Sequence, residues 1–385
     1  MSLIPMRPIL EAADRHMYGN GAFNMNAFCQ IEAALEVHRM LGSPAILQGA
    51  DLANGFMGGR MDFQNSTLED KKKGATNIAQ AVKAAVAKYD VPVCLHLDHG
   101  KNIDSVKAAI AGGYTSVMID GSSLPFAQNV ELTREVVKLA HPLGITVEGE
   151  LGVLAGIEDD VFSQTSTYTN PLDAIRFFKE TKVDALAISY GTKHGANKGK
   201  DTVIRKEIAI AVKECMLHEH IDGFLVSHGS SLVPQYIVNE INGLGGTIGN
   251  AHGIAIGQLQ QVISCGINKI NVDTDIRLVV TRNLRELFAC KPDLMQMPTT
   301  SSIWKLMEKD PSNFDPRYYL VPIMDTLMYG MVSDAQTKTV VEAVKAGVKE
   351  ILAILIVQFG SYGKMPLVEQ TSLEEMAEKY KKEGI

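Results

Sequence analysis

The sequence contains few of the features that mark several large classes of protein. Its five cysteines are dispersed over 385 residues without a C-x-x-C pair, so neither a disulfide framework nor a thiolate zinc site is indicated. No lysine and arginine block is longer than residues 71–73, and the net charge of -7 argues against nucleic acid as a partner. Apolar runs of about 18 residues and a signal-peptide core are absent. We therefore expect a cytoplasmic protein with no membrane partner.

The sequence does contain enough apolar material for a large core, arranged in short and regularly spaced runs. Apolar residues make up 46% of the chain and charged residues 21%, a balance typical of a globular α/β protein. Runs rich in β-branched residues predict eight strands, separated by segments with helical periodicity. The strands are expected at residues 21–26, 43–49, 91–99, 116–122, 146–152, 185–191, 223–229 and 267–273.

Alternation of strands and helices favours a parallel sheet, and eight such units favour closure into a (β/α)8 TIM barrel. An open doubly wound sheet is the alternative, but the turn after the first strand has no G-x-G-x-x-G. We predict that residues 1–280 form the barrel and carry the functional site. Residues 281–385 are expected to be a helical C-terminal extension, packed on the barrel or at a subunit interface, with a solvated tail. Residues 56–74 are expected to form a long loop.

Titratable residues gather at the carboxyl ends of the expected strands, where the loops of a barrel converge. Strand three ends in Asp98 and His99, while His194 follows strand six and His228 follows strand seven. The strand starts carry no comparable cluster. Three neutral imidazoles from separate strand ends suit a zinc ion with an open coordination position. The pattern predicts a catalytic metal site, although each histidine alone would fit an ordinary hydrogen-bonded loop residue.

His96 is a competing ligand from the same strand as His99. The two residues are three positions apart, so their side chains point to opposite faces of a regular strand and one ion cannot easily bind both. We therefore prefer His99. The other histidines lie on helical or loop segments and are expected to face solvent. They are His16, His38, His141, His218, His220 and His252.

Seven segments, in order along the chain, resemble the motifs of class II, zinc-dependent ketose-bisphosphate aldolases. They include "LHLDHG", "VEGELGVLAGIEDD", "HGSSLVP" and "INKINVDTDIR", and the similarity runs from about Gly21 to Arg277. The later segment "DPSNFDPRYYLVP" is similar to the longer fructose-bisphosphate aldolases of that family. The resemblance implies an enzyme of glycolysis and gluconeogenesis that reversibly cleaves fructose 1,6-bisphosphate to dihydroxyacetone phosphate and glyceraldehyde 3-phosphate.

The resemblance also implies a set of metal ligands. His99, His194 and His228 would hold the catalytic zinc, which offsets the negative charge that develops on the ketose oxygen. Asp120 and Glu150 would flank the zinc or hold it in an alternate, buried position. Both carboxylates could equally be structural hydrogen-bond acceptors.

Proton transfer is assigned by the resemblance to two carboxylates. Asp98 would move the proton on the C4 hydroxyl, and Glu158, on the loop after strand five, would be a mobile general acid/base. Asn271 would position the dihydroxyacetone moiety. The structural alternatives are that Asp98 orients a histidine, that Glu158 belongs to a solvated acidic turn and that Asn271 is an ordinary strand-end residue.

The phosphates are expected on the loops after strands six to eight, where backbone N–H groups and hydroxyls form an anion-binding nest. A Na⁺ or K⁺ ion would share these loops with Asp273. Arg277 and Arg317 would bind the second phosphate, the latter from a neighbouring subunit, which implies a homodimer or homotetramer. The alternatives are exposed ion pairs for the arginines and a solvated loop cation for Lys198. The full set is Gly195, Lys198, Gly229, Ser231, Asp273, Thr274, Arg277 and Arg317.

Three positions depart from the pattern of the family. Ala50 stands where serine is usual, Ser123 where histidine is commoner, and Leu232 where a small residue is usual. These departures leave open an aldolase for tagatose 1,6-bisphosphate or another phosphorylated ketose. A metal-dependent hydrolase on the same barrel is a more remote alternative, because "GAFNMN" lacks an H-x-H pair. A third alternative is a barrel that keeps the metal ligands but has lost catalytic activity.

Overall fold

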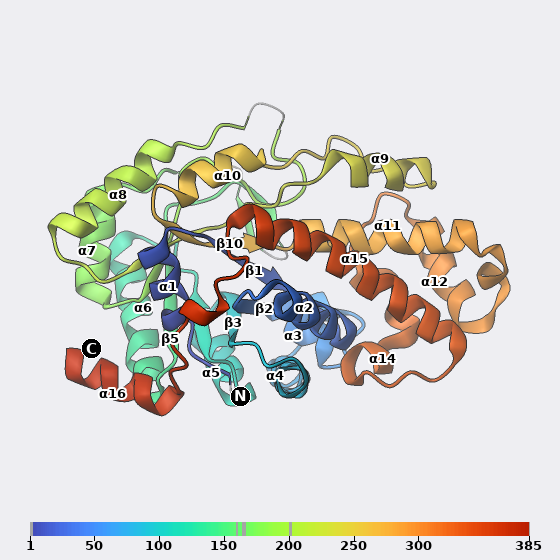
Figure 1. Ribbon diagram of the computed structural model, residues 1–385, viewed down its shortest axis with the longest axis horizontal. Coiled ribbons are helices and arrows are strands. Elements are labelled where there is room, and N and C mark those ends of the chain that lie inside the picture. The colour runs from blue at the N-terminus through green and yellow to red at the C-terminus, as the bar shows by residue number, and fades with distance from the viewer. Residues whose placement is uncertain (1–2, 159–160, 164–166, 200–201, 385) are drawn as a thin grey trace.

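The computed structural model is a closed barrel of eight parallel strands surrounded by helices (Figure 1), and it describes residues 3–158, 161–163, 167–199 and 202–384. Around the barrel the strands follow the order β1, β10, β9, β8, β5, β4, β3, β2. Every expected strand is present, so the prediction of a (β/α)8 barrel is confirmed. The strands are β1 (Asn20–Asn24), β2 (Ala45–Ala50), β3 (Val93–Gly100), β4 (Ser116–Ile119), β5 (Thr146–Leu151), β8 (Ala185–Ile188), β9 (Phe224–Ser227) and β10 (Ile267–Val272).

Helices alternate with the strands and continue after β10. Local sequence sets many of their limits: the Asn102 side chain caps α5, Pro171 starts α7, and Gly360 ends α15 in a left-handed conformation. The described helices are α1 (Arg7–His16), α2 (Phe28–Leu41), α3 (Asp51–Met57), α4 (Leu68–Tyr89), α5 (Ile103–Gly112), α6 (Phe126–Ala140), α7 (Pro171–Thr181), α8 (Lys206–His218), α9 (Gln235–Gly243), α10 (Ile256–Ile263), α11 (Thr274–Cys290), α12 (Pro298–Lys309), α13 (Pro316–Tyr319), α14 (Met324–Tyr329), α15 (Ala335–Phe359) and α16 (Leu373–Glu383).

Strand β3 shows how the barrel divides the core into two layers. Leu95 and Leu97 belong to the large hydrophobic cluster between the barrel and its helices, whereas Cys94 belongs to the smaller cluster inside the barrel. Successive side chains of a strand point to opposite faces. His96 and Asp98 therefore share the inner face with Cys94, and the barrel interior carries titratable groups as well as apolar ones.

The segment 56–74 is mostly helical, so the expectation of a long loop is wrong. It contains the end of α3, the short 3₁₀ helix Phe63–Asn65 and the start of α4. Thr67 and Asp70 form a capping box: the Thr67 hydroxyl accepts from the Asp70 N–H, and the Asp70 carboxylate accepts from the Thr67 N–H. The charged run that suggested a loop is the first turns of a capped helix.

The loop after β5 carries an antiparallel hairpin that the sequence analysis did not predict. Strand β6 (Gly156–Glu158) pairs with β7 (Val161–Ser163). Glu158 ends β6, and its side chain lies outside the described part of the chain. Gly156 has a φ of 112°, and a Cβ atom there would lie 2.4 Å from the carbonyl oxygen of His194. Glycine therefore lets the hairpin approach the loop that follows β8.

After β10 the chain is helical, as expected. Helix α15 packs against α2 and α11, and Figure 1 shows α11, α12, α14 and α15 on one side of the molecule and α16 on the other. Helix α11 crosses residue 280 without a break, and the division of the chain at that residue stays a prediction. Within the described ranges, no helix combines the length and the apolar character needed to cross a bilayer.

The amino-terminal end of the barrel carries a charged cluster that the strand starts do not supply. Arg7 of α1 is 2% exposed and pairs with Glu11, Asp222 and Glu383. These acids come from α1, from the connection between α8 and β9, and from α16. Helices and connections supply these residues, so the expectation that the strand starts carry no such cluster agrees with the structure.

Two histidines expected to face solvent, His38 and His141, are buried. The ring of His141 stacks on Tyr380 of α16 with the centroids 3.8 Å apart, and its Nε2 lies 2.9 Å from Asp184 Oδ2. The Tyr380 hydroxyl donates to Asp184 Oδ1 at 2.9 Å. Helix α16 thus docks on the barrel, so the expectation of a solvated tail is wrong.

We predict that Tyr380→Ala lowers the free energy of unfolding by about 3–5 kcal/mol, the range for removing a buried aromatic side chain. Tyr380→Phe keeps the stack on His141 and loses one hydrogen bond to a buried carboxylate, so it should cost about 1–3 kcal/mol. Chemical denaturation followed by circular dichroism measures both values. Tyr362→Ala is the control, because Tyr362 is 59% exposed. Equal losses in the two alanine variants would contradict the docking of α16.

Candidate metal centre

The carboxyl end of β3 presents two consecutive side chains to the mouth of the barrel. A regular strand would send Asp98 and His99 to opposite faces. His99 instead adopts a positive φ of 45°, and the pairing of β3 with β4 shifts register between Leu97 and Gly100. This irregularity re-aims the His99 ring, so both side chains face the same space.

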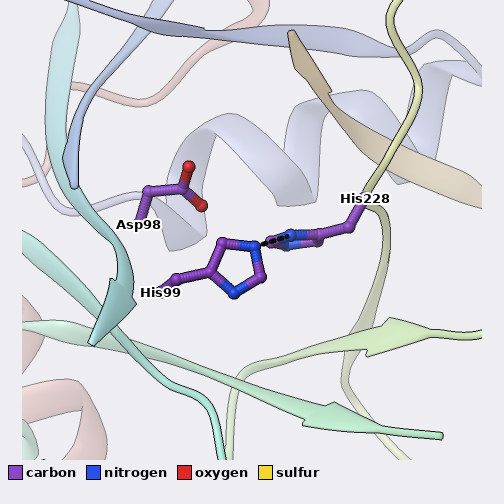
Figure 2. A group of neighbouring side chains, drawn as sticks. All are labelled: Asp98, His99 and His228. Atoms are coloured by element: carbon purple, nitrogen blue, oxygen red, sulfur yellow. Dashed lines mark hydrogen bonds between the residues drawn. The ribbon is translucent and has the colours of Figure 1, made fainter. Parts of the chain in front are cut away.

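Three histidine rings meet in that space. The centroid of the His99 ring lies 4.6 Å from that of His228, which follows β9, and 5.3 Å from that of His194, which follows β8. His99 Nε2 is 2.9 Å from His228 Nδ1, and Figure 2 shows these two nitrogens facing each other with Asp98 beside them. All three rings are at most 5% exposed. The structure thus brings together the three histidines singled out in the sequence.

The two facing nitrogens lie at hydrogen-bonding distance and are also placed to share a cation. His99 Nδ1 lies 3.1 Å from Asp120 Oδ2, and His228 Nε2 lies 2.8 Å from Glu148 Oε1. Because a carboxylate only accepts hydrogen bonds, each ring carries a hydrogen on that far side, which leaves the facing nitrogen of each ring as the one that could bind a metal. Two nitrogens bound to one tetrahedral zinc lie roughly 3.4 Å apart, somewhat farther than the 2.9 Å seen here. The donor set suits zinc.

Two overlapping groups of side chains could hold a metal. In each group the ligand atoms all lie within 4.8 Å of one another. One group is Asp98, His99 and His228, and the other is His99, Asp120 and Glu150. Neither His96 nor His194 belongs to these two groups, so the role of His194 as a ligand stays a prediction. His96 Nδ1 lies 2.8 Å from Ser116 Oγ. The preference for His99 over His96 agrees with this geometry.

The carboxylates around His99 favour positive charge at this point. Burial opposes protonation of the imidazole, but Asp98 and Asp120 raise the pKa of His99 well above its ordinary value. Burial likewise favours the neutral form of Asp120, yet its hydrogen bond with His99 lowers the pKa of Asp120 below the usual range. Glu150 Oε2 adds negative charge 3.8 Å from His99 Nδ1. A buried site that stabilises positive charge suits a cation.

Two amide side chains hold the carboxylate of Asp98. Asn24 Nδ2 donates to Oδ2 and Asn271 Nδ2 donates to Oδ1, both at 2.9 Å. Gln48 Nε2 in turn donates to Asn24 Oδ1 at 2.7 Å and so orients that amide. The sequence analysis missed Asn24 and Gln48, because a single polar residue in an apolar strand gives no spacing signal. Their inward-facing parity on β1 and β2 could have identified them.

Behind His228 lies a fully buried polar network that the sequence analysis also missed. Glu148 Oε2 accepts from Lys269 Nζ at 2.8 Å and lies 3.5 Å from His96 Nε2. All of these side chains, and that of His228, are 0% exposed. Burial favours the neutral acid, but Lys269 lowers the pKa of Glu148 below its ordinary range. Glu148 is therefore an ionised carboxylate in the barrel interior.

A cavity of about 160 Å³ lies next to the loop that carries His194. Arg277 Nε donates to Asp273 Oδ1 at 3.0 Å, and its Nη1 donates to Asp315 Oδ2 at 3.1 Å. Arg317 donates to Asp315 Oδ2 at 2.7 Å and lies 4.6 Å over the ring of Phe63. Five expected substrate residues line this cavity: Gly195, Asp273, Thr274, Arg277 and Arg317.

Arg317 lines the cavity of its own chain, which it reaches from α13. The supply of this arginine by a neighbouring subunit stays a prediction. The short segment that precedes α13 supplies Asp315, which pairs with both cavity arginines. The C-terminal extension therefore contributes directly to the site built by the barrel loops.

The other three expected substrate residues, Lys198, Gly229 and Ser231, are not among the described residues that line this cavity. Lys198 is 1% exposed, and its ammonium donates to the carbonyl oxygens of Lys193 and Gly195. The alternative of a solvated loop cation is thus wrong. Gly229 has a φ of 59°, and a Cβ atom there would lie 2.5 Å from the Lys193 carbonyl oxygen. Lys198 and Gly229 both support the loop that carries His194.

Comparison with known proteins identifies the family. The family model described as "Fructose-bisphosphate aldolase class-II" matches residues 4–364. The chain belongs to this family. A fructose-bisphosphate aldolase from Giardia intestinalis is 37% identical to it over 383 residues, covering 99% of this chain and 100% of that protein. Another, from Thermus caldophilus, is 38% identical over 321 residues, covering 83% and 92%. The resemblance drawn from the sequence motifs is confirmed.

Solved structures support the fold. A fructose-bisphosphate aldolase from Campylobacter jejuni superposes with a TM-score of 0.67 at 20% identity, covering 94% of this chain and 97% of that one. The YdjI aldolase from Escherichia coli K12 gives a TM-score of 0.63 at 24% identity, covering 94% and 99%. At these identities the likeness shows that the chain shares their architecture.

We predict that His228→Ala reduces bound divalent metal to background, because it removes one of the two facing nitrogens. Metal content after dialysis, measured by inductively coupled plasma mass spectrometry, tests this. His218→Ala is the matched control, since the His218 side chain is 84% exposed. If His228→Ala retained the metal content of the unmodified protein, the metal centre would have to lie elsewhere.

Proposed function

We propose that the chain is a zinc-dependent aldolase that reversibly cleaves fructose 1,6-bisphosphate to dihydroxyacetone phosphate and glyceraldehyde 3-phosphate. The observation that carries this proposal is the facing pair of ring nitrogens from His99 and His228 beside the carboxylate of Asp98. Membership of the class II family supports it, as do relatives named fructose-bisphosphate aldolase that align over nearly the whole chain.

His99, His194 and His228 are the proposed zinc ligands. Zinc bound there supplies a Lewis acid for the ketose carbonyl and its neighbouring hydroxyl, and so offsets the charge that develops as the carbon–carbon bond breaks. Asp120 orients His99 through Nδ1. Asp120 and Glu150, with His99, are also the proposed ligands of an alternate, buried position, which the second group of clustered ligand atoms supports.

Asp98 is the proposed base for the C4 hydroxyl proton. The amides of Asn24 and Asn271 donate to its two oxygens and fix its direction. Asn271 Nδ2 also lies 3.2 Å from His228 Nε2, a position that suits orientation of the dihydroxyacetone part of the substrate. Glu158 is the proposed second acid/base. It ends β6, the first strand of the hairpin, and this hairpin approaches the loop that carries His194.

The cavity that contains Arg277 and Arg317 is the proposed site of one phosphate. Gly195, Thr274, Gly229 and Ser231 are proposed to bind the phosphates through backbone N–H groups and hydroxyls, with Lys198 holding their loop in place. Arg277 already balances the charge of Asp273, so a role for Na⁺ or K⁺ stays a prediction. A homodimer or homotetramer and a cytoplasmic location also stay predictions, although five unpaired cysteines suit a reducing compartment.

One observation keeps tagatose 1,6-bisphosphate as the alternative substrate. Ala50 pairs in register with Asp98 at the ends of β2 and β3, and it is 7% exposed. The hydroxyl that is usual at this position in the family is therefore missing beside the proposed base. Loss of such a contact changes which ketose is bound best.

We expect cleavage of fructose 1,6-bisphosphate to stop on chelation and to return with zinc, since the histidine ligands hold an exchangeable metal. Release of triose phosphate measures this, with tagatose 1,6-bisphosphate assayed in parallel. A higher kcat/KM for the tagatose sugar would reassign the substrate. Cleavage that resists chelation would contradict the zinc mechanism, and release of inorganic phosphate instead of triose phosphate would indicate a hydrolase.

We predict that Asp98→Asn keeps the metal and lowers kcat by about 10²–10⁴-fold, the usual contribution of general acid–base catalysis. The amide retains one oxygen that can accept from Asn24 or Asn271, so the site should keep its shape. Steady-state kinetics and metal content are measured on the same preparation. Asp104→Asn, at an exposed position, is the control. Full activity in Asp98→Asn would show that another group moves the proton.

A further inference from the structure

We propose that Lys269 and Glu148 are positioning residues that fix the tautomer of His228 and thereby set the affinity of the metal centre. This inference rests on the proposed metal function of His99 and His228. A continuous chain of contacts carries it. Lys269 Nζ donates to Glu148 Oε2 at 2.8 Å, Glu148 Oε1 accepts from His228 Nε2 at 2.8 Å, and His228 Nδ1 faces His99 Nε2 at 2.9 Å.

The contact between Lys269 and Glu148 crosses the barrel interior. Glu148 lies on β5 and Lys269 on β10, and strands β8 and β9 separate these two strands in the barrel. Both side chains are 0% exposed. An isolated buried charge is very unfavourable, so these two side chains compensate each other. Lys269 thus holds the Glu148 carboxylate opposite His228, out of reach of water.

An ionised Glu148 decides which nitrogen of His228 carries the hydrogen. A carboxylate has no hydrogen to donate, so His228 must donate from Nε2 and present the lone pair of Nδ1 toward His99. A neutral acid or an amide at this position could donate to Nε2. The ring would then be free to carry its hydrogen on Nδ1, where it would block a metal. The lysine therefore acts on the metal centre through two intervening side chains.

Stability alone does not explain this buried ion pair. Replacing such a pair with apolar residues of similar volume is often neutral or stabilising. The interior of this barrel also accommodates apolar side chains, since Ala22, Ile46, Ala187 and Val226 are fully buried there. Orientation of His228 accounts for the pair. Lys269 and Glu148 meet across that interior, and Glu148 is directed at this proposed metal-ligand histidine.

The test uses the double variant Glu148→Gln with Lys269→Met, which removes both charges and leaves neither one buried alone. We expect its zinc affinity, measured by competition with a chromophoric chelator, to fall by about 10–100-fold, the usual effect of losing a group that orients a ligand. The visible spectrum of the cobalt-substituted protein should also change, because Nδ1 of His228 is no longer held in the coordinating form.

Asp184→Asn is the matched control. Asp184 is also a buried carboxylate beside a buried histidine, with its Oδ2 2.9 Å from His141 Nε2, but it lies at the amino-terminal end of the barrel. Its substitution should lower stability and leave zinc affinity and the cobalt spectrum unchanged. A merely structural role for Glu148 and Lys269 would make the two variants alike in every one of these measurements.

A second measurement uses the unmodified protein and so does not depend on whether a variant folds. The ring nitrogens of His228 in the metal-free, ¹⁵N-labelled protein should show a hydrogen on Nε2 and none on Nδ1 by NMR, and a hydrogen on Nδ1 would overturn the inference. Unchanged zinc affinity in the double variant would also overturn it, while triose phosphate release by the unmodified protein would leave the proposed function standing. Failure of the unmodified protein to bind zinc would overturn both.

Discussion

Most of the polar structure at the barrel mouth follows from one contact, the approach of His99 Nε2 to His228 Nδ1 at 2.9 Å. For both nitrogens to present lone pairs, each ring needs a carboxylate behind it, and Asp120 and Glu148 occupy those places. Each buried carboxylate then needs its own partners. The N–H and hydroxyl of Ser122 donate to Asp120, while Lys269 compensates Glu148. A requirement at the metal thus extends through the barrel interior.

The fold was predictable because its signals are local and repeated. Short β-branched runs alternate with helical periodicity eight times, and the chemistry recurs where each run ends. The residues that were missed lack such repetition. Glu148 and Lys269 are single polar residues within apolar strands, and 121 positions separate them in the sequence. Parity offered a partial clue, since Glu148 and Glu150 share one face of β5. The residues that pair with these glutamates can be identified only from the closed barrel, because distant parts of the sequence supply them.

The errors at the C-terminus and at residues 56–74 have different causes. The tail is strongly charged, and its sequence does not reveal that Tyr380 stacks on His141 at the far end of the barrel. Such a contact depends on which surface the other elements leave uncovered. The signal at residues 56–74 was local and readable, because Thr67 and Asp70 have the spacing of a capping box. The charged composition of that segment suggested a loop, whereas the capping box of Thr67 and Asp70 indicates a helix.

The metal centre and the proposed phosphate cavity share one loop, which explains why that loop is held so firmly. His194 and Gly195 are consecutive, one at the histidine cluster and the other lining the cavity. Within this loop, the ammonium of buried Lys198 donates to the carbonyl oxygen of Gly195.

In the cavity, Asp273 and Asp315 already hold Arg277 and Arg317 in place. A phosphate bound as proposed would replace these carboxylates as the partner of arginines that are already held in place, which would lower the entropic cost of binding. If both proposed sites are occupied, this shared loop would position the reacting carbons relative to the metal, as catalysis by orientation requires.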